Sequence, residues 1–143
     1  MRAFLDTNIL VSALATRGLC ADLYERLLTE HEVVIGEPVV LEVLDILQRK
    51  FKATEALLTK VEAELRLLEV IPAQASAPNL PIHDKEDPWV LACALQAKAD
   101  YFVTGDAELL ALGSVAQLPF ISPSACWDIL ASGQLLQSNS DFL

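Results

Sequence analysis

Short apolar runs alternate with longer segments of helical periodicity along this chain, and this alternation limits the possible folds more than any other feature. The short runs are rich in β-branched and aromatic residues and are bounded by polar residues, glycine or proline, as strands are. The predicted strands are residues 2–5, 33–35, 70–71, 101–103 and 120–121. Strands that alternate with helices are typical of an α/β fold with a mainly parallel sheet.

The segments between these runs carry apolar residues at three- and four-residue spacing, which predicts amphipathic helices. The predicted helices are residues 8–18, 21–30, 38–51, 54–68, 87–97, 108–112 and 123–130. No linker is long enough to divide the chain, so we expect one domain over residues 1–143. The polar tail from about residue 132 is expected to be peripheral and frayed.

Cysteine usage and hydropathy indicate a cytoplasmic protein. No apolar run reaches the roughly 18–20 residues that a membrane span needs, and Asp6 and Asn8 interrupt the apolar stretch that a signal peptide would require. Cys20, Cys93 and Cys126 are odd in number and widely spaced, which argues against a disulfide framework or a zinc knuckle. Cys93 lies in an apolar run and is predicted to be a core residue.

The charge balance is unusual for a protein that binds nucleic acid. The chain has 10 Lys+Arg and 20 Asp+Glu, giving a formal net charge of −10. Nucleic-acid-binding proteins usually gain affinity by neutralising phosphates with basic side chains. Bound divalent cations or a basic partner protein would reduce this conflict.

Four acidic residues follow strands or lie in the first turns of predicted helices. Asp6 and Asp106 follow strands, Glu42 lies one turn into a helix, and Asp87 begins a helix before Pro88. Because the carboxyl ends of parallel strands share one edge of a sheet, these side chains can converge. Carboxylates brought close together raise one another's pKa values unless a cation compensates them. Magnesium and manganese prefer such oxygen ligands, and the chain has no His-x-x-x-His or Cys-x-x-Cys spacing to suggest another ligand set.

Each of these acids also has an ordinary structural interpretation. Asp6 and Asp87 could cap the helices that follow them. Glu42 could be a solvated helix residue, and Asp106 could be a turn residue. Capping and metal binding are compatible, because one carboxylate oxygen can serve each. The functional interpretation therefore depends on the four acids together.

The segments around these acids resemble the PIN-domain family. Phe4-Leu5-Asp6-Thr7-Asn8 resembles its first motif, a strand followed by Asp, Thr or Ser, and Asn. Residues 38–43 around Glu42, residues 87–95 and residues 99–106 resemble the second, third and last motifs. Each motif alone is weak, but four in order at ordinary spacing, from residue 2 to about residue 110, are a strong signal.

The resemblance implies a three-layer α/β/α fold with a central, mainly parallel sheet. It also implies one or two magnesium or manganese ions held by the matching acids, which are Asp6, Glu42, Asp87 and Asp106. In family terms Thr104 would hydrogen-bond within the site and Asn8 would support Asp6. Two neighbouring acids leave the set open, because Asp84 could share the role of Asp87 and Glu108 could assist Asp106.

The resemblance further implies a metal-dependent endoribonuclease that hydrolyses RNA phosphodiester bonds. The most similar members are toxins of bacterial and archaeal toxin–antitoxin pairs, so an antitoxin protein is an expected partner. A homodimer is also expected, with helices such as residues 61–68 as a possible surface. One alternative is a degenerate PIN fold that only binds protein, against which the intact set of acids speaks. Another is a phosphatase with Asp6 as nucleophile, but such folds favour Asp-x-Asp where this chain has Asp6-Thr7-Asn8.

The sequence assigns no RNA-binding residue. Arg49, Lys50 and Lys52 form the densest basic cluster and could contact an RNA backbone. Cations near a helix C-terminus are equally well explained by the helix macrodipole. Trp89 and Trp127 could stack on bases, but their apolar helical settings favour packing in a core or an interface.

Overall fold

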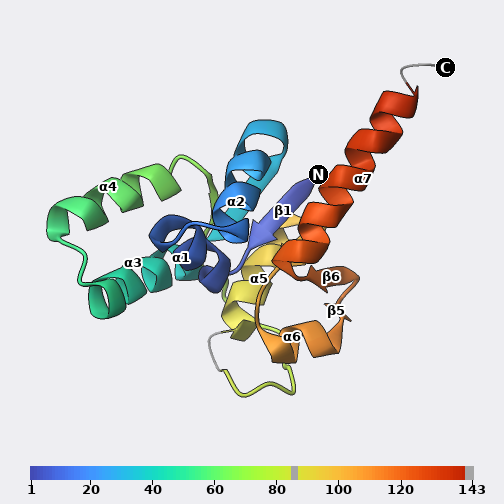
Figure 1. Cartoon of the computed structure of the whole chain (residues 1–143). Helices are drawn as coiled ribbons and strands as arrows, with labels where there is room; N and C mark the ends of the chain where they lie inside the picture. Colours follow the sequence, from blue (N-terminus) through green and yellow to red (C-terminus); the bar gives the residue numbers. More distant parts are fainter. Residues whose placement is uncertain (85–86, 141–143) are drawn as a thin grey trace.

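A six-stranded sheet forms the centre of the computed structural model, which describes residues 1–84 and 87–140, with side chains described up to residue 133 (Figure 1). The strands are β1 (Arg2–Leu5), β2 (Glu32–Gly36), β3 (Glu69–Ile71), β4 (Tyr101–Val103), β5 (Ser114–Val115) and β6 (Leu118–Ile121), in the spatial order β3-β2-β1-β4-β6-β5. All pairs are parallel except β5 with β6. This arrangement confirms the predicted mainly parallel sheet.

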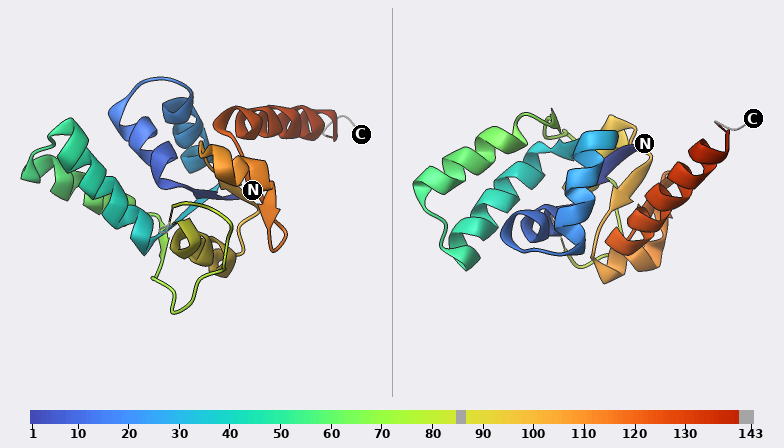
Figure 2. Two further views of the ribbon diagram at one scale, coloured as in Figure 1. Left: turned by 90° about the horizontal axis from the view of Figure 1, so that it is seen from below. Right: turned by 45° about the horizontal axis from the view of Figure 1, so that its top comes forward.

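Helices lie on both faces of this sheet. They are α1 (Thr7–Ala15), α2 (Leu19–Glu30), α3 (Glu37–Phe51), α4 (Glu55–Leu65), α5 (Asp87–Ala97), α6 (Ala107–Leu112) and α7 (Pro123–Ser140). Figure 2 shows α1, α2 and α7 over one face and α5 on the other. Helix α3 packs against both α1 and α4, and the pair α3 and α4 projects beyond the sheet (Figures 1 and 2). The predicted α/β architecture with helices on both faces is confirmed.

The direction in which the sheet grows reverses between β1 and β4. From β1 the chain adds β2 and then β3 on one side, and α5 carries it back to place β4 on the other side of β1. In parallel sheets such a switch point opens a crevice at the carboxyl ends of the strands. Leu5 is in register with Val103, so the segments that leave both strands enter the same crevice.

Aromatic rings pack together on three neighbouring strands of the sheet, β1, β4 and β6. Phe4 of β1, Phe102 of β4 and Phe120 of β6 are in register with one another and buried. The rings of Phe4 and Phe102 stack with centroids 5.4 Å apart, and Phe102 meets Phe120 edge-on at 5.4 Å. Such pairs contribute about 0.5–1.5 kcal/mol each beyond their burial, which helps fix the register at the crevice.

Helix α5 buries most of its residues, because it packs against β2 and β3 of the sheet and also contacts α3. Val90, Leu91 and Cys93 are almost fully buried, which confirms the expectation that Cys93 is a core residue. Gly36, at the end of β2, lies so close to α5 that an added Cβ would come within 2.7 Å of the Cys93 Cβ. The absence of a side chain at this glycine is what allows β2 and α5 to approach.

Several elements differ from the sequence prediction. Helix α1 ends at Ala15 rather than near residue 18. Helix α4 ends at Leu65 rather than near residue 68, because a turn there redirects the chain into β3. Helix α7 continues to Ser140, so the prediction that it ends near residue 130 is wrong. The short strand β5 was not predicted, because its turn uses Ala116 and Gln117 at positive φ instead of the usual Asn-Gly. No helix within the described part of the chain is long and apolar enough to span a bilayer.

Candidate active site

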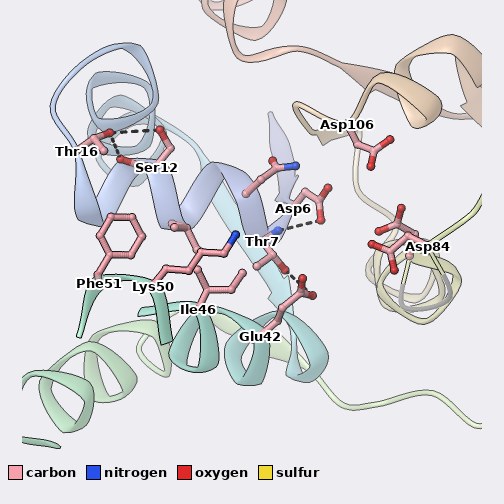
Figure 3. Close-up of a pocket in the computed structure, with 13 residues that line it drawn as sticks. Asp6, Thr7, Ser12, Thr16, Glu42, Ile46, Lys50, Phe51, Asp84 and Asp106 are labelled. Atoms are coloured by element: carbon pink, nitrogen blue, oxygen red, sulfur yellow. Dashed lines mark hydrogen bonds between the residues drawn. The ribbon is translucent and has the colours of Figure 1, made fainter. Parts of the chain in front are cut away.

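A pocket of about 380 Å³ opens at the switch point between β1 and β4 (Figure 3). It is lined by Asp6, Thr7, Asn8, Val11, Ser12, Thr16, Glu42, Ile46, Lys50, Phe51, Asp84, Asp87 and Asp106. The four acids predicted from sequence are all among these residues, and they come from four different parts of the chain. The structure therefore brings the predicted carboxylates to one place, as the strand-end argument required.

Asp6 is buried and both of its carboxylate oxygens accept hydrogen bonds. Oδ1 accepts from the backbone N–H of Thr7 at 2.8 Å, which makes Asp6 the N-cap of α1. Oδ2 accepts from the hydroxyl of Thr104 at 2.7 Å. Asp6 thus has the capping role considered from sequence and also lines the pocket. Its carboxylate is held in one orientation by donors from two separate elements.

Thr104 connects Asp6 to Asp106. Its fully buried hydroxyl donates to Asp6 and accepts from the backbone N–H of Asp106 at 3.0 Å. Oδ1 of Asp106 in turn accepts from the backbone N–H groups of Glu108 and Leu109 at 2.8 and 3.1 Å, so Asp106 is the N-cap of α6. One hydroxyl therefore fixes the relative positions of two candidate ligands.

Glu42 reaches the pocket from α3 and is held there by α1. The hydroxyl of Thr7 donates to Oε2 of Glu42 at 3.1 Å. Thr7 was not among the residues predicted to support the site, although it occupies the Thr-or-Ser position of the first motif. Asn8 accepts a hydrogen bond from the backbone N–H of Gly105 at 3.2 Å. Any support of Asp6 by Asn8 is thus indirect, through the turn that follows β4.

Asp87 and Asp84 approach the pocket from the side of α5. Asp87 is buried and is the first residue of that helix, so the cap position before it falls at residue 86, outside the described residues. Asp84 lines the pocket, whereas Glu108 does not. The Glu108 carboxylate accepts instead from His83, through its backbone N–H at 3.1 Å and its ring Nδ1 at 2.8 Å. Asp84 is therefore better placed than Glu108 to join the four acids.

Burial and mutual repulsion alter the protonation of this site. Burial raises the pKa of Asp87 to about 7, with further increases from the nearby carboxylates, above all Asp6. Burial also raises the pKa of Asp6, while the donors Thr104 and Thr7 oppose this shift and the Asp106 charge adds to it. Near neutral pH, Asp87 therefore changes between its protonated and its ionised form.

The oxygen atoms that line the pocket are of the kind that hard divalent cations prefer as ligands. Carboxylates and hydroxyls line the inner part of the pocket, and no histidine or cysteine is among the lining residues that the structure describes. The described residues nevertheless include no group of three acids, histidines or cysteines spaced as a preformed metal cluster. The carboxylates share a pocket without converging on one point. Carboxylates placed this close to one another raise one another's pKa values, as they do for Asp87.

A family model described as PIN domain matches residues 2–108 of the chain. The chain belongs to the PIN-domain family. The matched segment begins with β1 and includes Asp6, Glu42, Asp87 and Asp106. This finding confirms the family predicted from the four motifs. The role of the acids as metal ligands stays a prediction.

Solved structures with the same fold include VapBC2 of Rickettsia felis, bound to a DNA fragment from its promoter. It has a TM-score of 0.59 and 16% identity over 85% of this chain and 98% of that one. VapC20 of Mycobacterium tuberculosis, a toxin that cleaves the sarcin-ricin loop, has a TM-score of 0.58 and 16% identity over 82% and 98%. VapBC-1 of nontypeable Haemophilus influenzae has a TM-score of 0.58 and 17% identity over 87% and 99%.

These similarities establish the fold of this PIN domain. At 16–17% identity they do not transfer an activity. No curated protein matches the chain at a significant level.

Proposed function

We propose that this PIN domain is a metal-dependent endoribonuclease that hydrolyses RNA phosphodiester bonds. Magnesium or manganese would be held by Asp6, Glu42, Asp87 and Asp106, with Asp84 available as a further carboxylate. The observation that carries the proposal is that these acids, which lie far apart in sequence, line one pocket at the switch point of a parallel sheet.

The pocket acids and the groups that hydrogen-bond to them each have a definable task in this reaction. Bound in the pocket, the ion would lower the pKa of a water molecule and offset the charge that develops on the phosphate. The two donors to Asp6 fix its orientation, and Thr7 does the same for Glu42. Asp87, whose pKa is raised to about 7, must lose its proton before it can serve as a ligand.

RNA as substrate and an antitoxin as partner are supported by the nature of the fold neighbours. VapC20 is described as a toxin that cleaves an RNA loop, and the other two structures are toxin–antitoxin complexes. A net charge of −10 also fits a protein that depends on divalent cations or a basic partner to approach RNA.

The proposal is tested by incubating labelled RNA with the purified chain in magnesium, in manganese and in EDTA. Asp6→Asn removes one carboxylate from the pocket, whereas Asp22→Asn makes the same change on an exposed position of α2. We expect cleavage that requires the metal, that falls by about a hundredfold or more in Asp6→Asn, and that is unchanged in Asp22→Asn. Equal rates in both variants and in the wild type would overturn the assignment.

A further inference from the structure

The pocket continues beyond the carboxylates, along the groove between α1 and α3. Glu42, Ile46 and Lys50 recur every four residues, so they lie along the same face of α3. Val11 and Ser12 of α1 and Thr16, which follows that helix, form the facing wall, and Phe51 lies at the far end. We refer to the part lined by Val11, Ser12, Thr16, Ile46, Lys50 and Phe51 as the α1–α3 groove. It leads directly from the candidate metal ligands to the basic end of α3 (Figure 3).

Lys50 is the only lysine or arginine among the described residues that line this pocket. Its side chain extends along the groove toward Thr7 in Figure 3. In the described part of the chain it forms no hydrogen bond or ion pair. The adjacent Arg49 differs, because its guanidinium pairs with Asp45 at 2.7 Å and it lines a separate hollow of α3. The macrodipole alone therefore does not account for the direction in which Lys50 points.

Phe51 exposes half of its surface at the end of the same groove. In Figure 3 its ring faces the side of α1 that carries Ser12 and Thr16. Proteins that bind single-stranded nucleic acid use an exposed aromatic ring beside a lysine. Bases stack on the ring, and a phosphate contacts the ammonium group. Its position is fixed by the end of α3, where Lys52 adopts a left-handed conformation at φ 55°.

We propose that the α1–α3 groove binds the nucleotide next to the cleaved bond of a single-stranded RNA. Lys50 contacts a phosphate that is not cleaved, and Phe51 stacks on a base. This inference rests on the proposed function, because it takes the carboxylates as the place of cleavage. Eight residues of helix separate Glu42 from Lys50, about 12 Å at 1.5 Å per residue, which is room for contacts to two different phosphates.

The groove also explains how so acidic a chain can hold RNA. Lys50 supplies local attraction for phosphate beside a wall of carboxylates, and the ring adds affinity that does not depend on charge. Stacking is tolerant of base identity because every base has a π-face. The groove therefore selects unpaired strands over duplexes, and it positions the strand without reading its sequence.

The test measures binding of a fluorescent single-stranded RNA by anisotropy, with the full chain in the Asp6→Asn background. Lys50→Ala should reduce the slope of log affinity against log salt by about 0.7, the effect of losing one phosphate contact. Arg49→Ala removes the same charge one residue away and should leave the slope unchanged. Lys50→Arg should retain it. Phe51→Leu should weaken binding by roughly 5- to 100-fold at an unchanged slope, and Phe51→Trp should restore it.

Cleavage kinetics separate this inference from the proposed function. In chains that keep Asp6, Lys50→Ala and Phe51→Leu should raise KM and leave kcat within about twofold. RNA that is cleaved with an unchanged KM in both variants would overturn the groove but not the nuclease. RNA that is bound through Lys50 and Phe51 but not cleaved by the wild type would overturn the nuclease but not the groove.

Three further outcomes would overturn the proposed role of the α1–α3 groove. Equal effects of Lys50→Ala and Arg49→Ala would show a general charge effect and overturn the assignment of Lys50. If Phe51→Leu changes only the sedimentation of the protein, from a larger to a smaller species, the groove is an interface between two copies of the chain and the proposal fails. RNA that is neither bound nor cleaved overturns both proposals. Circular dichroism of these surface variants verifies that each is folded.

Discussion

The hydroxyl of Thr104 donates a hydrogen bond of 2.7 Å to Oδ2 of Asp6, although the two residues are 98 positions apart. The same hydroxyl accepts from the backbone N–H of Asp106. Because β1 and β4 are parallel neighbours, a single buried side chain can orient one acid and fix the backbone of the other. The geometry of the candidate metal site therefore depends on this threonine as much as on the acids.

Replacement of Thr104 by valine tests this dependence. The variant keeps the volume but leaves Oδ2 of Asp6 without its donor and the Asp106 N–H without its acceptor. We expect manganese affinity and RNA cleavage to fall by about 10- to 100-fold, as for other partners of metal ligands. Thr104→Ser retains the hydroxyl and should remain near wild type. Valine and serine variants of equal activity would show that the bond has no part in the site.

The raised pKa of Asp87 predicts how stability depends on pH in EDTA. The unfolded carboxyl ionises near 3.8 and the folded one near 7, so the folded state holds the additional proton between these values. The contribution of Asp87 to the free energy of unfolding is therefore lost as the pH rises from about 4 to about 7. The free energy of unfolding of the wild type, relative to Asp87→Asn, should decrease across this interval in urea titrations. A relative increase would contradict the assigned direction.

The same ionisation predicts that metal affinity rises with pH. A protonated Asp87 cannot serve as a ligand, so manganese should bind more tightly as the pH increases through about 7. Calorimetry over this range measures the effect, and Asp87→Asn should show weak binding with a flatter pH profile. A wild-type affinity that is independent of pH would exclude Asp87 as a ligand that must first lose a proton.

Two acids that the sequence could not assign are distinguished by their contacts. Asp84 lines the pocket, whereas the Glu108 carboxylate accepts two hydrogen bonds from His83. We expect Asp84→Asn to weaken manganese binding by roughly tenfold. Glu108→Gln, whose amide oxygen can still accept from His83, should leave binding unchanged. The reverse pattern would place Glu108 rather than Asp84 in the site.

Gly36 is predicted to be a position where only glycine fits. A Cβ there would lie 2.7 Å from the Cβ and 2.8 Å from the Sγ of Cys93. Gly36→Ala should therefore destabilise the protein by about 1–3 kcal/mol in urea denaturation. Gly105→Ala is the control, because its nearest neighbour would be Oδ1 of Asn8 at an ordinary 3.7 Å. If Gly36→Ala leaves the free energy of unfolding unchanged, β2 and α5 separate easily and the close contact with Cys93 does not require glycine.

The positions that sequence predicted well are those fixed by local pattern. The strand before Asp6 and the strand before Asp106 are apolar runs with clear ends, and parallel pairing then forces the two acids to one edge. Glu42 and Asp87 were placed in the first turns of predicted helices and matched family motifs, but their convergence depends on how α3 and α5 pack. That packing involves contacts between distant segments, which no local pattern reports.

The features that sequence did not predict depend on the orientation of side chains. The bond from Thr7 to Glu42 requires α1 and α3 to meet at one rotation, and the direction of Lys50 follows from the same packing. Arg49 and Lys50 are indistinguishable in the basic cluster of the sequence, yet one pairs with Asp45 and the other faces the pocket.

The claim on which the account rests is that the pocket acids bind a divalent cation together. Calorimetric titration of manganese into the wild type and into Asp6→Asn, at mildly alkaline pH where Asp87 is ionised, tests it most directly. The account predicts saturable binding to the wild type and binding at least tenfold weaker in the variant. No binding to the wild type, or identical isotherms for the two proteins, would contradict it and favour a PIN fold that serves only to bind protein.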